Sequence, residues 1–250
     1  MKYPLLPFGG LMPDLWACLN IYQEEQLLPE CIESIRKYNP EAKIVAVDGA
    51  YQSWVDENKK LCGLEQSFGH YQVTDAMVRF TSPQSTDKTL EILRDFKVDV
   101  IIECEKDEHG NYKPWEHEYT KRSRYFVGKP GDYYLVIDGD ERPEKRLDWE
   151  KLTAPCYNVI LKRDEEHYRP YPIMRVHKHV DGMKYFGAHH VLWYGDVMWR
   201  KEMCEDLDYA LFHRFTYRAV RDPLRHLAKT AYYRNLTSSE EGPFRRQHGF

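Results

Sequence analysis

The sequence contains no apolar run long enough to cross a membrane, and its first residues do not have the pattern of a secretion signal. Pro4, Pro7, Gly9, Gly10 and Pro13 interrupt any hydrophobic stretch there. A signal peptide needs an unbroken apolar segment, and a membrane-spanning helix needs a longer one. We therefore expect a cytoplasmic protein with no transmembrane segment.

The cysteines include no C-x-x-C pair. The six are scattered along the chain, at Cys18, Cys31, Cys62, Cys104, Cys156 and Cys204. Neither a disulfide framework nor a zinc site is indicated by such spacing. We expect the cysteines to be reduced and mostly buried.

The chain also lacks a large net charge, internal repeats and low-complexity segments. Its formal charge of −4 argues against a general nucleic-acid binder. From Leu211 onward, however, eight Lys or Arg residues stand against three acidic ones, an excess of +5. Such a basic stretch is either a solvated face or a surface that meets an anionic ligand. With 250 residues and 42% hydrophobic content, the chain can form one large α/β domain.

The first half alternates predicted strands and helices. Strands are predicted at 15–19, 44–47, 98–102 and 133–137, and helices over about 23–35, from 85 and over about 115–124. Short links between strand, helix and strand are typical of a parallel sheet. Residues 51–84 have a mixed pattern that predicts no clear element. Their aromatic residues could stack on a sugar ring or form a lid, and a packed decoration of the fold is the alternative.

The second half has a different pattern. Strands are predicted at 158–161, 173–177, 190–194 and 209–213, followed by a helix over 221–234 and a loose tail after Ser238. Turns between successive strands favour a mixed or antiparallel extension. The predicted fold is thus a Rossmann-like, mostly parallel sheet flanked by helices, with a mixed or antiparallel C-terminal extension.

Two carboxylates one residue apart follow the strand at 133–137. Asp138 and Asp140 enclose Gly139, directly after five aromatic and aliphatic residues. The carboxyl ends of parallel strands open onto the ligand crevice, and side chains at i and i+2 share a face. Oxygen donors placed in this way suit Mg²⁺ or Mn²⁺ bound together with substrate phosphates. Asp206 and Asp208 have the same spacing but follow no apolar strand, so we assign that pair to chance.

Taken in order, these motifs resemble those of family-2-type inverting glycosyltransferases with the GT-A fold. The segments that carry the resemblance are Tyr22-Gln23-Glu24-Glu25, Val47-Asp48-Gly49, Ser85-Thr86-Asp87-Lys88-Thr89, Arg122-Ser123, Asp138-Gly139-Asp140-Glu141, Gly187-Ala188-His189-His190 and His213. The chain departs from the family pattern at Gln23, Lys88, Ser123 and His190, which replace Asn, Gly, Asn and Glu. The resemblance covers roughly residues 14–215 and is strongest before 142. It implies a single GT-A domain over 1–250, with a nucleotide-sugar-binding half (14–141) and an acceptor-side half (142–250).

The resemblance also implies roles for individual residues. Ile21, Tyr22 and Glu24 would contact the donor, and Asp48 would accept a hydrogen bond from a uracil-type base, although it also suits a strand-end cap. Arg122 would support the phosphates, and Asp138 would reach the ribose or the metal. Asp140 and His213 would hold Mn²⁺ or Mg²⁺, which would bridge the diphosphate; His213 also suits a core position.

The expected activity is metal-dependent transfer of a sugar from a nucleotide diphosphate sugar, UDP type favoured, to an acceptor nucleophile with inversion. The acceptor stays open between a glycan, a protein, a small molecule and a modified nucleobase. We predict the catalytic base among His190, Asp196 and His189, on the side opposite the leaving diphosphate. The alternatives are a nucleotidyltransferase or sugar-nucleotide hydrolase, and a catalytically silent module that binds nucleotide or carbohydrate.

Overall fold

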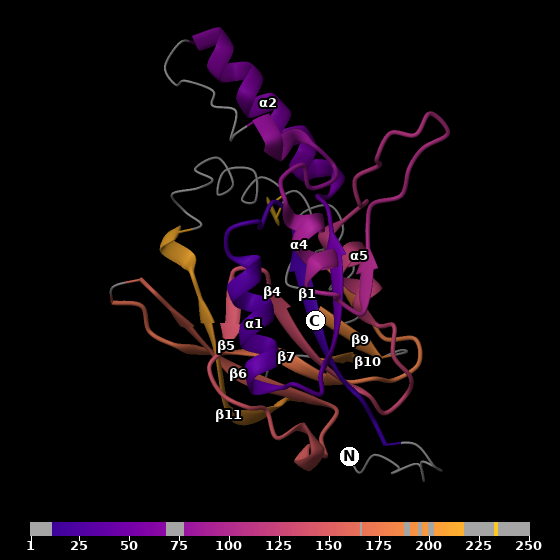
Figure 1. Ribbon diagram of the computed structural model, residues 1–250, viewed down its shortest axis with the longest axis vertical. Helices are drawn as coiled ribbons and strands as arrows, with labels where there is room; N and C mark the ends of the chain where they lie inside the picture. Colours follow the sequence, from indigo (N-terminus) through magenta and orange to yellow (C-terminus); the bar gives the residue numbers. More distant parts are fainter. Residues whose placement is uncertain are drawn as a thin grey trace.

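A computed structural model gives the arrangement of the chain (Figure 1). It describes residues 12–68, 78–165, 167–187, 191–194, 197–199, 203–217 and 233–234. Within these ranges no helix has the length and apolar character that crossing a membrane requires. The predicted helix over 221–234 falls almost entirely outside the described residues, and so does the tail after Ser238.

The first half forms the parallel part of the main sheet. Its strands are β1 (Leu15–Ile21), β2 (Lys43–Asp48), β3 (Val100–Ile102) and β4 (Tyr133–Asp138). Its helices are α1 (Leu28–Tyr38), α2 (Gln52–Phe68), α4 (Thr89–Asp95) and α5 (Glu118–Arg122), with 3₁₀ turns at Arg79–Thr81 and Ser123–Tyr125. β1 pairs in parallel with β2 on one side and with β4 on the other, and β2 pairs with β3. The predicted strand–helix–strand beginning is confirmed.

Alternate residues of these strands pack into two separate cores, one on each face of the sheet. On β4, Tyr134 and Val136 join the core that contains Trp54 and Tyr125, whereas Leu135 and Ile137 join the core that contains α1. Because side chains alternate across a strand, a strand buried on both faces is apolar throughout. Figure 1 shows α1 lying across one face of the sheet.

The second half extends the sheet with mixed strand directions, as expected. Its strands are β5 (Glu141–Pro143), β6 (Cys156–Arg163), β7 (Tyr171–Lys178), β8 (Lys184–Phe186), β9 (Val191–Tyr194), β10 (Val197–Trp199) and β11 (Glu205–His213), with a 3₁₀ turn at Trp149–Lys151. The main sheet has the order β3-β2-β1-β4-β7-β6-β11-β5, and β10-β9-β8 form a smaller sheet. β7 is antiparallel to β4 and β6, whereas β11 runs parallel to β6. The predicted fold class is therefore confirmed. The short strands β5, β8 and β10 were not predicted, because three residues carry too little periodicity to be recognised.

The expectation that residues 51–84 form no clear element is wrong in part. They contain α2, a helix of 17 residues that extends away from the sheet at the top of Figure 1. Its first residues include Trp54 and Val55, which are buried in the same core as Tyr51. Asn58 and Cys62, further along α2, are buried as well.

The expectation of reduced cysteines is also wrong in part. Cys156, at the start of β6, forms a disulfide with Cys204, and their Cα atoms lie 5.1 Å apart. The sequence separation of 48 residues gave no sign of the pairing, because strand order decides which distant cysteines meet. Cys18, Cys31, Cys62 and Cys104 are buried, as predicted.

Candidate active site

The polar residues of the first half gather at the carboxyl ends of β1, β2 and β4. In the sheet register Asn20 lies opposite both Val47 and Asp138, and Ile21 lies opposite Asp48. The three strands therefore end at one level and present their last residues to one edge. This is the edge at which open parallel sheets bind ligands.

A pocket opens at this edge. Three of the residues assigned to donor binding, Ile21, Tyr22 and Glu24, line it. Tyr51 and Trp54 from the start of α2 form a further aromatic wall, with ring centroids 5.5 Å apart. The pocket thus combines flat apolar faces with a few polar groups, which is the composition of small-molecule sites.

The loop after β1 is fixed in the conformation that shapes this pocket. Gln23 adopts a φ of 56°, and its backbone N–H donates to Ser85 Oγ at 2.8 Å. Its side chain donates to the carbonyl of Arg79 at 2.9 Å and accepts from the Thr86 N–H at 3.2 Å. A left-handed residue is costly unless its surroundings hold it, and here the Gln23 amide supplies those bonds. Gln23 therefore holds the loop after β1 in place.

Two charged residues of α5, Glu118 and Lys121, also line the pocket. Lys121 is only 3% exposed, and its ammonium donates to the Ile21 carbonyl at 2.6 Å. Burial lowers the pKa of Lys121 to about 8. Sequence reasoning placed Lys121 on a helix but not in the site, because a lysine on a short helix is normally solvated.

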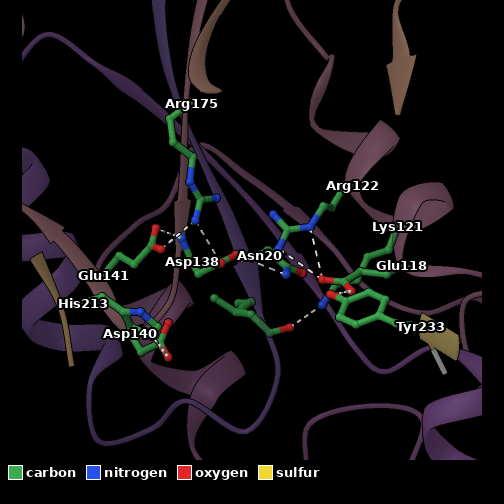
Figure 2. Close-up of polar contacts among 11 residues, drawn as sticks. Asn20, Glu118, Lys121, Arg122, Asp138, Asp140, Glu141, Arg175, His213 and Tyr233 are labelled. Carbon is green, nitrogen blue, oxygen red and sulfur yellow. Dashed lines mark hydrogen bonds and ion pairs between the residues drawn. The ribbon is translucent and has the colours of Figure 1, made fainter. Parts of the chain in front are cut away.

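Asp138 lies in a chain of buried charges that Figure 2 shows. Arg122 Nη2 lies 2.8 Å from Asp138 Oδ1 and 3.1 Å from Glu118 Oε1, and Arg175 Nη2 lies 3.3 Å from Asp138 Oδ2 and 2.6 Å from Glu141 Oε1. Burial raises the pKa of Glu141, and the neighbouring Arg175 opposes that shift. Arg175 stands on β7 and had not been assigned to the site, since nothing local in the sequence connects it to Asp138.

Asn20 connects this charge chain with the pocket. The side-chain amide of Asn20 donates to Asp138 Oδ1 at 3.3 Å, and Asn20 also lines the pocket. Gly139 lies close to the loop after β1, because a Cβ atom at position 139 would lie 2.9 Å from Ile21 Cγ2 and 3.0 Å from Glu24 Cγ. Any residue larger than glycine would push the Asp138–Asp140 loop away from the pocket.

Asp140 and His213 form the part of the site best suited to a metal ion. Asp140 Oδ2 lies 3.0 Å from His213 Nε2, and both side chains are buried. This separation is that of a direct hydrogen bond between the two side chains. Two donors in adjacent positions on an octahedral ion, each at about 2.1 Å, also lie about 3 Å apart, so the pair could hold Mn²⁺ or Mg²⁺ in place of the hydrogen bond. Among the described residues no group of three or more His, Cys, Asp or Glu side chains is placed to hold a metal ion. Asp138, engaged by two arginines, fits the predicted metal-ligand role less well.

Asp48 is fully buried behind the pocket. Ser85 donates to it from both its backbone N–H at 3.1 Å and its hydroxyl at 2.6 Å, and Gln84 donates from its side-chain amide. Burial raises the pKa of Asp48 to about 6, while these donors act in the opposite direction. The observed contacts match the strand-end cap, and base recognition by Asp48 stays a prediction.

The predicted catalytic bases His189, His190 and Asp196 lie outside the described residues. The second Asp-x-Asp pair is clearly separate from the site. Asp206 accepts a hydrogen bond from Asn158, and Asp208 is exposed beside Lys145. That a preceding apolar strand separates a functional pair from a chance pair stays a prediction.

The chain was compared with known proteins. No protein-family model matches it, and no curated protein matches it. Among solved structures it is similar to S. aureus TarS 1–349 in complex with UDP, with 15% identity and a TM-score of 0.40 over 63% of this chain and 38% of that chain. The UDP-GlcNAc complex of TarS 1–349 gives 14% identity and a TM-score of 0.39, over 63% of this chain and 37% of that one. The matched region spans less than two thirds of TarS, and we draw nothing about function from so distant a similarity.

Proposed function

We propose that the protein is a metal-dependent glycosyltransferase that moves a sugar from a UDP-type nucleotide sugar to an acceptor nucleophile. One observation carries the proposal: an aromatic-walled pocket and the Asp138–Asp140 loop share one sheet edge, and Asn20 links them. A nucleobase would occupy the pocket between Tyr22, Tyr51 and Trp54. Its diphosphate would then extend toward Asp140 and His213.

In this proposal Asp140 and His213 hold Mn²⁺ or Mg²⁺. The ion, when bound, stabilises the negative charge that grows on the leaving nucleotide. Arg122 and Arg175 hold the Asp138 carboxylate in place at the end of β4, and Asn20 orients the same carboxylate from the pocket side. Inversion requires a base on the face opposite the diphosphate, and His190, Asp196 and His189 remain our candidates.

Binding is tested first by thermal unfolding with UDP, CDP, GDP, ADP and TDP, each with and without Mn²⁺. A ligand at one hundred times its Kd stabilises the folded state by about 2.7 kcal/mol, which is readily measured. We expect UDP to stabilise most and to require the cation. Stabilisation by UDP that is unchanged in chelator would contradict the metal site.

Turnover is tested by release or transfer of the sugar from UDP-sugars, followed by mass spectrometry. Asp140→Asn keeps the size of the side chain and removes its charge, so activity should fall at least a hundredfold, about 2.7 kcal/mol of transition-state stabilisation. Asp208→Asn makes the same change in the exposed Asp-x-Asp pair and should leave activity unaltered. Tight UDP binding without turnover for any sugar or acceptor would favour the silent binding module, and reaction with water alone would favour the hydrolase.

A further inference from the structure

Lys121 is a buried cation placed at the wall of an open pocket. An ammonium group has three N–H donors, and among the described residues Lys121 makes one hydrogen bond, to the Ile21 carbonyl. With 3% of the residue exposed, bulk water does not solvate the remaining donors well. A buried charge is costly unless it is paired or hydrogen-bonded, so this position favours a ligand that supplies acceptors.

The groups around Lys121 act on its pKa in both directions. Asp48 on β2, Cys104 after β3 and Glu118 on α5 raise the pKa, whereas the neighbouring cation Arg122 lowers it. Burial lowers the pKa of Lys121 to about 8, the Asp48 carboxylate partly offsets that effect, and the ammonium form therefore predominates at neutral pH.

The pocket wall also offers flat faces close to this donor, from Tyr22, Tyr51 and Trp54. Glu118, one helical turn before Lys121, lines the same pocket, but its Oε1 accepts from Arg122 and its Oε2 accepts from Tyr233. Uracil presents two carbonyl oxygens on its polar edge, so an ammonium at the pocket wall complements an acceptor of that edge. Asp48, by contrast, does not line the pocket.

We propose that Lys121 donates a hydrogen bond from Nζ to a carbonyl oxygen of the uracil base and so determines base specificity at this pocket. The inference rests on the proposed function, since it assumes that the nucleotide of the donor occupies the pocket. It gives the base-reading role to α5, whereas the resemblance gives that role to Asp48.

The experiment separates the base from the phosphates by measuring dissociation constants for uridine, UDP and inorganic pyrophosphate, all with Mn²⁺. Lys121→Met keeps the length of the side chain and removes the charge, and Lys113→Met makes the same change at an exposed site. A hydrogen bond from a charged donor contributes enough that its loss weakens binding about 10- to 100-fold. For Lys121→Met we expect the affinities for uridine and for UDP to fall by the same factor, and the affinity for pyrophosphate to stay unchanged. For Lys113→Met we expect no affinity to change.

Lys121→Gln is the second variant, and the unfolding temperature of each ligand-free variant verifies that it is folded. If UDP weakens while uridine does not, Lys121 contacts the phosphates and the inference is overturned. Unchanged affinity for uridine and UDP in folded Lys121→Met or Lys121→Gln overturns it as well, while leaving the proposed function standing. If wild-type protein binds neither uridine nor UDP, both the inference and the proposed function fail.

Discussion

Arg175 holds together the buried charges behind the site, so its removal should have a large and measurable effect on stability. Its Nη2 lies 2.6 Å from Glu141 Oε1 and 3.3 Å from Asp138 Oδ2, and the residue is only 7% exposed. Arg175→Met would leave the Glu141 carboxylate, 2% exposed, without this cation. Removing one partner of a buried ion pair costs about 3–5 kcal/mol because the other charge stays buried.

That cost translates into a lower melting temperature. For a domain of this size about 1 kcal/mol corresponds to 2–4 °C, so we expect a loss of roughly 6–20 °C. Urea unfolding gives the same quantity as a free energy. Arg146→Met is the matched control, because Arg146 is 45% exposed in its pairs with Glu41 and Glu150. Exposed pairs contribute about 0–1 kcal/mol, and the control should lose no more.

The pH dependence gives a further test of the same reasoning. Burial raises the pKa of Glu141 in the folded protein, and Arg175 limits that rise. A group with a raised folded-state pKa favours folding below its unfolded pKa, and this contribution is lost as pH rises through the folded pKa. Without Arg175 the pKa of Glu141 rises further. The loss of unfolding free energy in Arg175→Met should therefore be large near neutral pH and become smaller as the pH falls toward the ordinary pKa of glutamate, about 4.3.

Adding Glu141→Gln to Arg175→Met should restore part of the stability, since the amide carries no charge to bury. The reasoning is refuted if Arg175→Met is as stable as Arg146→Met. It is also refuted if the Arg175→Met deficit grows as the pH falls.

Further predictions concern the metal, the pocket, the insertion and the disulfide. His213→Ala should weaken Mn²⁺ affinity about 10- to 100-fold by titration, and unchanged affinity would assign His213 to the core. UDP affinity should fall as pH rises from about 7 to 8.5, because Lys121 with a pKa of about 8 loses its proton, and Lys121→Met should lack this step. Replacing residues 60–77 by a Gly/Ser linker keeps Tyr51 and Trp54, so donor affinity should stay within about twofold while acceptor use falls; equal losses would contradict a role in acceptor binding. Cys156→Ser should cost about 4 kcal/mol in urea unfolding under oxidising conditions, as closure of a 48-residue loop implies, and no loss would mean that the bond contributes nothing.

The alternation of apolar strands and helices in the first half was sufficient to predict the parallel sheet. Residues 133–137 are apolar throughout, and only a strand covered on both faces buries such a run. Because parallel strands end at one edge, the positions of Asp138 and Asp140 followed from where the apolar run stops. Ile21, Tyr22 and Glu24, which the resemblance assigned to the donor, line the pocket, and their contact with a donor stays a prediction.

Other features depended on which distant segments become neighbours, and only the tertiary structure decides that. Arg175 reaches Asp138 because β7 pairs antiparallel with β4, and the disulfide forms because Cys204 lies near the start of β6. Lys121 is buried because α5 packs its polar side against the end of β1, which helical periodicity does not reveal. Local sequence determines which strands and helices form, since backbone propensity and side-chain alternation act over a few residues. The pairing of charges across the site depends on strand order and register, which arise only when the whole sheet assembles.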